Sequence, residues 1–169
     1  NSKGEGAAAC KDTIGKQFGN FEKWVRNDAP ERLAGWHLLD DCYRPDNGGD
    51  TVGLAYVNQI CTNGGYNMGV SYDLDPTWMT LAHELGHSFG LSHSFEDGAG
   101  ETGGIMDYYN NEYEGHYQFN TKYRKAEWCN TVGSAIYDAK RCAAGGDTLF
   151  TSKNMMPVIS AVCGDGVVS

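Results

Sequence analysis

Residues 83–93, HELGHSFGLSH, contain three histidines, one glutamate and two glycines. On a helix, His83 and His87 are one turn apart and project from the same face, so both imidazoles can reach one ion. Gly90 permits the left-handed residue that commonly ends a helix, and the chain can then turn so that His93 approaches from another direction. The spacing therefore predicts a metal site with three protein ligands and one open position.

An open coordination position is typical of a catalytic zinc site, whereas a structural zinc site is closed by four protein ligands. Three neutral imidazoles leave the full charge of a zinc ion to polarise a water molecule, which lowers the pKa of that water to about 7. Glu84 follows His83 and can touch the water without being a ligand, so it is the candidate general base. The competing interpretation, incidental polar residues on a core helix, requires this rare pattern to arise by chance.

Apolar periodicity predicts the elements that position these residues. Residues 12–27 predict a helix, because apolar side chains recur there at steps of three and four. Three apolar stretches separated by turn-rich segments predict strands, namely WHLLD (36–40), VGLAYV (52–57) and MGVSYD (68–73). Asp75 and Pro76 predict the start of a second helix, which runs through the histidine motif to Gly90. TKYRKAEWCNTVGSAIYDAKR predicts another long helix after a loop that extends to about residue 120.

Composition limits the class of protein. The 169 residues fit one domain, and 13 basic against 22 acidic residues give a net charge of −9, which excludes nucleic acid and anionic membrane surfaces as expected partners. The chain opens with Asn1 and contains neither a signal-peptide core nor an apolar run of about 18 residues, so we expect a processed or excised piece.

Six cysteines occur at wide spacings without a CxxC pair: Cys10, Cys42, Cys61, Cys129, Cys142 and Cys163. This even number favours up to three disulfides and an oxidising, extracellular or lumenal compartment. Reduced thiols buried in a cytosolic protein are the alternative.

The metal motif resembles that of the metzincin zinc endopeptidases, His-Glu-x-x-His-x-x-Gly-x-x-His followed by a Met-turn. The matching positions are His83, Glu84, His87, Gly90 and His93, and GGIMDY at 103–108 resembles the Met-turn, with Met106 beneath the imidazoles. The resemblance implies the α+β class, with a small twisted mixed sheet, a backing helix, an active-site helix, a Met-turn and a C-terminal helix.

Within the metzincins, the chain resembles the adamalysin or reprolysin branch, which includes the ADAM proteases and snake-venom metalloproteases. The segments FGNFEKWV, WHLLDD, TVGLAYVNQIC and MGVSYD follow that branch's order of helix, strand, edge strand and strand. Two further strands and a helix usually precede this part, and without them the sheet has three strands. CGDGVVS at 163–169 resembles the opening of a disintegrin-like domain, so we expect a catalytic domain over residues 1–162 and a disintegrin-like stub over 163–169.

Three departures from the branch concern single residues. Ser94 follows the third histidine where the branch usually has Asp, and HSFGLSHS is equally similar to the matrixins. The branch usually has a cysteine between that histidine and the Met-turn. None occurs here, so Cys129 lacks its implied partner, whereas Cys61 with Cys142 is the pair that the resemblance implies. Tyr108 is similar to a tyrosine of astacins and serralysins that approaches the zinc or the transition state, with aromatic packing as the alternative.

The resemblance implies a zinc-dependent endopeptidase that hydrolyses internal peptide bonds of extracellular proteins, with Glu84 as general base. Its substrate would bind as an extended strand along the exposed edge at Gly53–Val57. We expect a secreted chain or the ectodomain of a larger membrane-anchored protein, with membrane association only in the second case. The alternative is a non-catalytic adhesion or interaction module with structural zinc, although such a relic would be expected to lose Glu84. A trimming exopeptidase would need a charged clamp for a chain terminus.

Two acidic turns carry oxygen ligands of the kind that calcium accepts, namely Asp46, Asn47, Asp50, Glu96, Asp97 and Glu101. Solvation of these turns is the alternative to a calcium site. His37 falls in a predicted strand and His116 in a polar loop, so neither is expected to be a zinc ligand.

Overall fold

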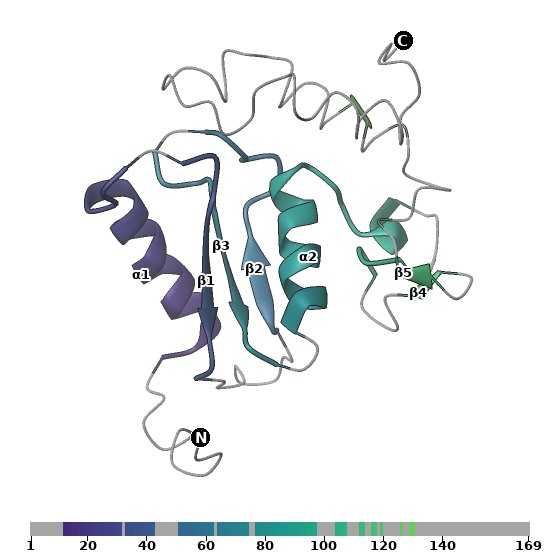
Figure 1. Cartoon of the computed structure of the whole chain (residues 1–169), viewed down its shortest axis with the longest axis horizontal. Helices are drawn as coiled ribbons and strands as arrows, with labels where there is room; N and C mark the ends of the chain where they lie inside the picture. Colours follow the sequence, from purple (N-terminus) through teal and green to yellow (C-terminus); the bar gives the residue numbers. More distant parts are fainter. Residues whose placement is uncertain are drawn as a thin grey trace.

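The computed structural model describes residues 12–31, 33–42, 51–62, 64–74, 77–97, 104–107, 112–113, 116–117, 119, 126 and 129–130. Its elements in chain order are α1 (Ile14–Asn27), β1 (Trp36–Asp40), β2 (Gly53–Ala55), β3 (Met68–Tyr72), α2 (Thr77–Ser88), the short 3-10 helix η1 (Ser94–Asp97), β4 (Glu112–Tyr113) and β5 (His116–Tyr117). Figure 1 shows β1, β3 and β2 side by side, with α1 on one side of the view and α2 on the other. These elements form the expected α+β domain.

The main sheet is mixed and has the strand order β1-β3-β2. β1 runs parallel to β3, with Leu38 opposite Val70. β2 runs antiparallel to β3, with Leu54 opposite the same valine. Within the described residues the sheet therefore has three strands, and β2 lies at its edge, as the sequence predicts.

One face of the sheet forms the hydrophobic core with α1. Ile14, Met68, Val70 and Tyr72 are completely buried there, and burying a side chain such as Val70 contributes about 1.5–3 kcal/mol. Trp24 of α1 lies edge-to-face against Trp36 of β1, with ring centroids 5.2 Å apart. Side chains of α1 and the strands complete this core, namely Phe18, Phe21, Val25, Trp36, Leu38, Leu54, Tyr56 and Leu74. The helix predicted to back the sheet is therefore α1.

The opposite face carries small and polar residues, because alternate strand positions point to opposite sides. Gly53 pairs with Ser71 and Ala55 pairs with Gly69, and α2 packs against β2 and β3 on this side. His37 also lies on this face, and its Nε2 is 2.9 Å from the Ser71 Oγ. The short side chains leave room for the polar side chains that α2 directs toward the sheet.

Several predicted boundaries differ from the structure by one or two residues. The first helix begins at Ile14, after Thr13 in an extended conformation, and the edge strand contracts to Gly53–Ala55 because the chain enters a turn in which Asn58 has a φ of 58°. The third strand ends at Tyr72 instead of residue 73. The loop predicted before residue 120 contains the pair β4 and β5, whose two-residue strands are too short to produce an alternating pattern.

Other predictions fall largely on residues outside the described set. Asp75 and Pro76 lie there, as do most of the third predicted helix and residues 163–169. Of that third helix, Ala126, Cys129 and Asn130 are described and helical. The proposed division at residue 162 stays a prediction.

Every described cysteine is in a disulfide, namely Cys42, Cys61 and Cys129. Reduced thiols are therefore the wrong expectation for these three. Cys129 has a partner even though the chain lacks the cysteine that the resemblance would supply. The pair of Cys61 with Cys142 stays a prediction, because Cys142 lies outside the described residues.

Among the described residues, no helix combines the length and the apolar character needed to cross a membrane.

Candidate metal centre

The helix α2 ends with the left-handed residue that Gly90 predicts. Gly90 has a φ of +98°, which lies in the range that favours glycine. Its N–H donates to the His87 carbonyl at 2.7 Å, and the Leu91 N–H donates to the Gly86 carbonyl at 3.0 Å. This pair of hydrogen bonds is a Schellman motif, and it reverses the chain so that His93 returns toward the helix.

The segment that follows β2 is tied to the same helix end. The Asn58 N–H donates to the His87 carbonyl at 2.8 Å, and the Ile60 N–H donates to the Ser88 carbonyl at 3.0 Å. The last carbonyls of a helix have no α-helical partner, so Ile60 provides a donor for the Ser88 carbonyl, while Asn58 adds a second donor to the His87 carbonyl beside that of Gly90. They also fix the end of α2 relative to the edge strand.

The three histidines of the motif converge on one point. The Nε2 atoms of His83, His87 and His93 lie 3.1 Å from one another in every pair, and these residues form a group able to hold a metal ion. Zinc–nitrogen bonds are about 2.0–2.1 Å long, so one ion can contact three nitrogens at this separation. The side chains therefore fit zinc.

Hydrogen bonds at the outer ring nitrogens orient these imidazoles. The Nδ1 of His83 lies 2.6 Å from the Ile105 carbonyl, and the Nδ1 of His87 lies 2.8 Å from the Leu91 carbonyl. A carbonyl oxygen only accepts, so each Nδ1 must donate, which leaves the lone pair of each Nε2 for a metal. The Nδ1 of His93 lies 2.9 Å from the Glu96 Oε1 in an ion-pair contact.

Burial also favours the neutral, metal-binding form of the imidazoles. Desolvation lowers the pKa of His83 to about 4, although its hydrogen bond to Ile105 acts in the opposite direction. Desolvation lowers the pKa of His87 as well, with the hydrogen bond to Leu91 opposing it. Both rings are therefore unprotonated at neutral pH and can act as ligands.

Glu84 is buried beside these ligands, with 5% of its surface exposed. Burial raises the pKa of its carboxyl group to about 8, because the charged form loses its hydration. A carboxylate with a raised proton affinity near neutral pH is suited to accept and return a proton.

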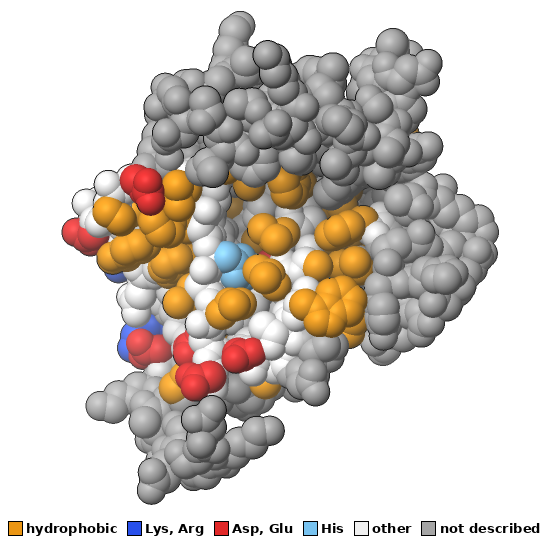
Figure 2. All heavy atoms as spheres, viewed as in Figure 1, with side chains coloured by type: hydrophobic (Ala, Val, Ile, Leu, Met, Phe, Trp, Pro, Cys, Tyr) orange, Lys and Arg blue, Asp and Glu red, His pale blue; other side chains and the backbone are white. Residues whose placement is uncertain are grey.

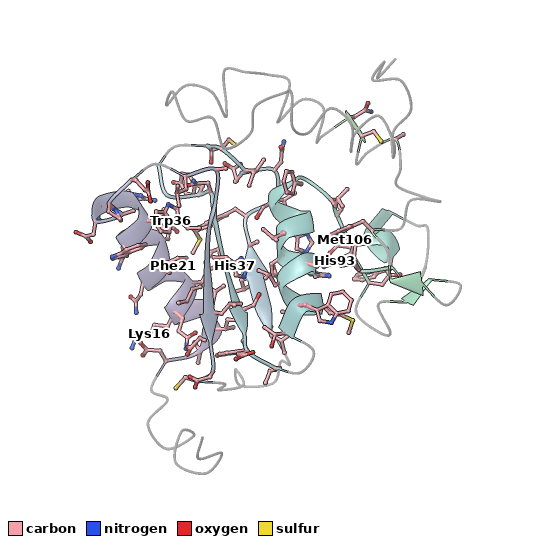
Figure 3. All side chains as sticks on the ribbon, viewed as in Figure 1. Lys16, Phe21, Trp36, His37, His93 and Met106 are labelled. Atoms are coloured by element: carbon pink, nitrogen blue, oxygen red, sulfur yellow. The ribbon has the colours of Figure 1, made fainter. Side chains whose placement is uncertain are left out.

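The predicted Met-turn lies against α2. The Asp107 N–H donates to the Gly104 carbonyl at 2.9 Å and closes the turn, and Met106 is completely buried. Figure 3 shows Met106 and His93 close together beside α2. A β-carbon at Gly86 would collide with the Met106 sulfur and lie 3.2 Å from its Cε, so this glycine lets the methionine approach the helix between two ligand turns. Tyr108 lies outside the described residues.

A cleft of about 700 Å³ opens along the metal centre. The edge strand β2 forms one wall, and the three histidines and Glu84 also border the cleft. The remaining lining residues are Thr51, Val52, Val57, Met79, Thr80, Ser92, Glu96 and Asp107. An extended chain lying against β2 would therefore pass beside the metal ligands.

The other candidate site residues stay apart from this centre. His37 belongs to β1 and contacts Ser71, and the backbone of His116 belongs to β5. Within the described part of the chain, the three motif histidines are the only group of three or more potential ligands. Of the suggested calcium ligands, Glu96 contacts His93 and Asp97 ends η1. The others lie outside the described residues, namely Asp46, Asn47, Asp50 and Glu101.

Sequence reasoning missed several residues that support the centre. Residue types cannot show that the carbonyls of Ile105 and Leu91 accept from the histidines, because every residue carries a carbonyl. The sequence suggests Glu96 only as a calcium ligand, although its position three residues after His93 places it one 3-10 turn away. Gly53 and Gly86 act through contacts with other segments, which a linear pattern does not show.

The mixed sheet, the histidine cluster and the Met-turn define a metzincin-like zinc metalloprotease domain. A sequence model of metallo-peptidase family M12 matches residues 5–159, and the chain belongs to this family.

Curated relatives match shorter segments. The chain is 38% identical over 78 residues to the mouse (Mus musculus) disintegrin and metalloproteinase domain-containing protein 15, covering 44% of this chain and 9% of the relative. It is 36% identical over 92 residues to the zinc metalloproteinase-disintegrin-like brevilysin H2a of Gloydius brevicauda, covering 51% of this chain and 20% of the relative. Both relatives are thus much longer than the matched segment.

Proposed function

We propose that this chain is a zinc-dependent endopeptidase that hydrolyses internal peptide bonds of extracellular proteins. The observation that carries the proposal is the convergence of three Nε2 atoms, 3.1 Å apart, in a cleft that Glu84 also borders. Membership of a metallopeptidase family supports the same reaction class. His83, His87 and His93 are the proposed zinc ligands, with Met106 and Gly90 in supporting roles.

The edge strand β2 is the proposed binding surface for substrate. Its outer backbone groups can pair with an extended peptide, as in other cases of strand addition. Pairing along the backbone holds a peptide bond at a constant position while accepting many side-chain sequences. The cleft beside Gly53–Ala55 then brings that bond to the metal centre.

Glu84 is the proposed general base and acid. Zinc held by the three imidazoles would supply Lewis acidity to polarise the scissile carbonyl and to activate a water molecule. Glu84 takes a proton from that water and later delivers it to the leaving amine. Tyr108 is the proposed second stabiliser of negative charge on the carbonyl oxygen.

Secretion or an ectodomain location is the proposed setting. The disulfides at Cys42, Cys61 and Cys129 support it, because such bonds persist in oxidising compartments. Relatives whose names pair disintegrin with metalloproteinase support a catalytic domain over residues 1–162 followed by the start of a disintegrin-like domain.

The test is incubation of the zinc-loaded chain with a diverse peptide library, with cut sites identified by mass spectrometry. Replacing Glu84 with Gln keeps the shape of the side chain and removes its basicity. We expect the wild type to cut internal bonds and Glu84→Gln to lose at least about 100-fold in rate, the lower range for removal of a general base, while zinc affinity stays within about threefold.

Two outcomes would contradict the proposal. Tight zinc binding without cleavage by the wild type would favour the non-catalytic adhesion or interaction module. Equal cleavage by both chains would show that another group, or a contaminating protease, moves the proton.

A further inference from the structure

We propose that Gly53 is the residue that positions Glu84 for catalysis, because its missing side chain leaves the space that the carboxyl group occupies. This inference rests on the proposed function. It assigns to the edge strand a second role besides pairing with substrate.

The packing of β2 against α2 leaves no space for a β-carbon at Gly53. A β-carbon added at Gly53 would lie 2.8 Å from both Cγ and Cδ of Glu84 and would also collide with Oε1. Non-bonded carbon atoms pack at about 3.5–4.0 Å, so the side chain of Glu84 or the strand would have to move. Figure 1 shows β2 directly beside α2.

Backbone conformation does not require glycine here. The glycines with positive φ among the described residues are Gly64, Gly65 and Gly90, whereas Gly53 is an ordinary strand residue paired with Ser71. Alanine could adopt the same backbone dihedral angles. The requirement at this position is therefore steric, and it comes from Glu84.

Catalysis should suffer more than metal binding when this space is filled. The colliding atoms belong to the end of the Glu84 side chain, which borders an open cleft and can move into it. The ligands are held separately, since His83 and His87 donate to the carbonyls of Ile105 and Leu91. Displacing the carboxyl group would therefore leave the metal site formed and the base misplaced.

Gly53→Ala is the central variant, and Gly19→Ala is the matched control. Gly19 lies in α1, and a β-carbon there meets nothing within 4 Å. We expect Gly53→Ala to lower kcat by at least about tenfold, since misplacing a catalytic group by about 1 Å can cost about 100-fold. KM and the zinc dissociation constant should stay within about threefold. Gly19→Ala should leave kcat, KM and the zinc dissociation constant unchanged.

A second pair of variants separates positioning of the base from damage to the strand. Glu84→Ala removes all three atoms that a β-carbon at Gly53 would meet, namely Cγ, Cδ and Oε1. We expect Gly53→Ala to change the residual kcat by less than about twofold in the Glu84→Ala background, because the two effects are coupled. An equal loss in both backgrounds, a loss of zinc affinity in Gly53→Ala, or no loss of kcat would each overturn the inference.

Thermal unfolding decides the case if the wild type cleaves no peptide. That result would refute the proposed function, but the steric contact would still be measurable. We expect any fall in Tm caused by Gly53→Ala to disappear when Glu84 is replaced by Ala. A fall of the same size with either residue at position 84 would show that Gly53 does not act through Glu84.

Discussion

The three candidate ligands differ in what holds their outer nitrogens. His83 and His87 donate to uncharged backbone carbonyls, whereas His93 faces the carboxylate of Glu96 at 2.9 Å. The hydrogen bond with His93 lowers the pKa of Glu96, so this carboxyl group stays ionised at neutral pH. A carboxylate behind a ligand histidine fixes the ring and increases its basicity toward the metal.

Glu96→Gln should therefore weaken zinc binding. The amide keeps an oxygen acceptor but loses the charge, and changes of this kind cost about 10- to 100-fold in metal affinity. Since 53% of the Glu96 side chain is exposed, we expect the lower end, about tenfold. Competition with a chelator of known affinity measures the zinc dissociation constant of each chain. Glu31→Gln, a change at an exposed carboxyl outside the site, is the control, and equal affinities in all three chains would exclude the role of Glu96.

At the scale of elements, the end of α2 couples helix geometry to ligand placement. Gly90 carries the left-handed conformation that lets the chain reverse before His93. A residue with a β-carbon is strained there, and the cost is about 1–2 kcal/mol. The same reversal positions Leu91, whose carbonyl accepts from His87.

Gly90→Ala should accordingly destabilise the metal-free chain by about 1–2 kcal/mol and weaken zinc binding. Urea unfolding measures the first effect and chelator competition the second. Gly19→Ala should instead raise the free energy of unfolding by about 0.5–1 kcal/mol. Glycine within a helix is unfavourable, and the added methyl group meets nothing within 4 Å. Stability unchanged by Gly90→Ala would show that the helix end can adopt another conformation.

At the scale of the whole molecule, the sheet face opposite α1 contains a histidine outside the metal centre. Figure 3 shows His37 between β1 and α2, and Figure 2 shows a histidine among hydrophobic side chains in the middle of the same view, with acidic side chains below. A β-carbon at Gly69 would lie 2.8 Å from the His37 ring. Burial lowers the pKa of His37 to about 4.

This histidine should make the fold sensitive to acid. Its folded-state pKa lies below the unfolded value of 6.5, so the unfolded chain binds more protons between these values. The resulting stability is complete above about pH 6.5 and is lost as the pH falls toward 4, with a slope approaching about 1.4 kcal/mol per pH unit.

Urea unfolding of the wild type and His37→Gln from pH 4.5 to 7.5 measures this slope. His83 and His87 add slopes of the same sign in the metal-free chain, since burial lowers their pKa values too. The difference between the two chains isolates His37. Parallel curves would mean that His37 binds protons equally well in the folded and unfolded chains.

The candidate metal ligands and the helix end can be predicted from the sequence because they depend on contacts close in sequence. Two histidines one helical turn apart share a face in any helix, and a glycine after the last turn can reverse the chain. The apolar stretches WHLLD and MGVSYD, bounded by turn-rich segments, likewise predict two strands to within one residue. Local backbone geometry alone establishes these features.

The environment of the ligands depended on segments distant in sequence. Gly53 faces Glu84 only because β2 pairs with β3 beneath α2, and Ile105 meets His83 only because the Met-turn returns to that helix. Such contacts arise from strand pairing and helix packing, which depend on the burial of many side chains together. The spacing of the motif thus specifies which atoms can bind zinc, while packing specifies their tautomers, their pKa values and the place of the Glu84 carboxyl group.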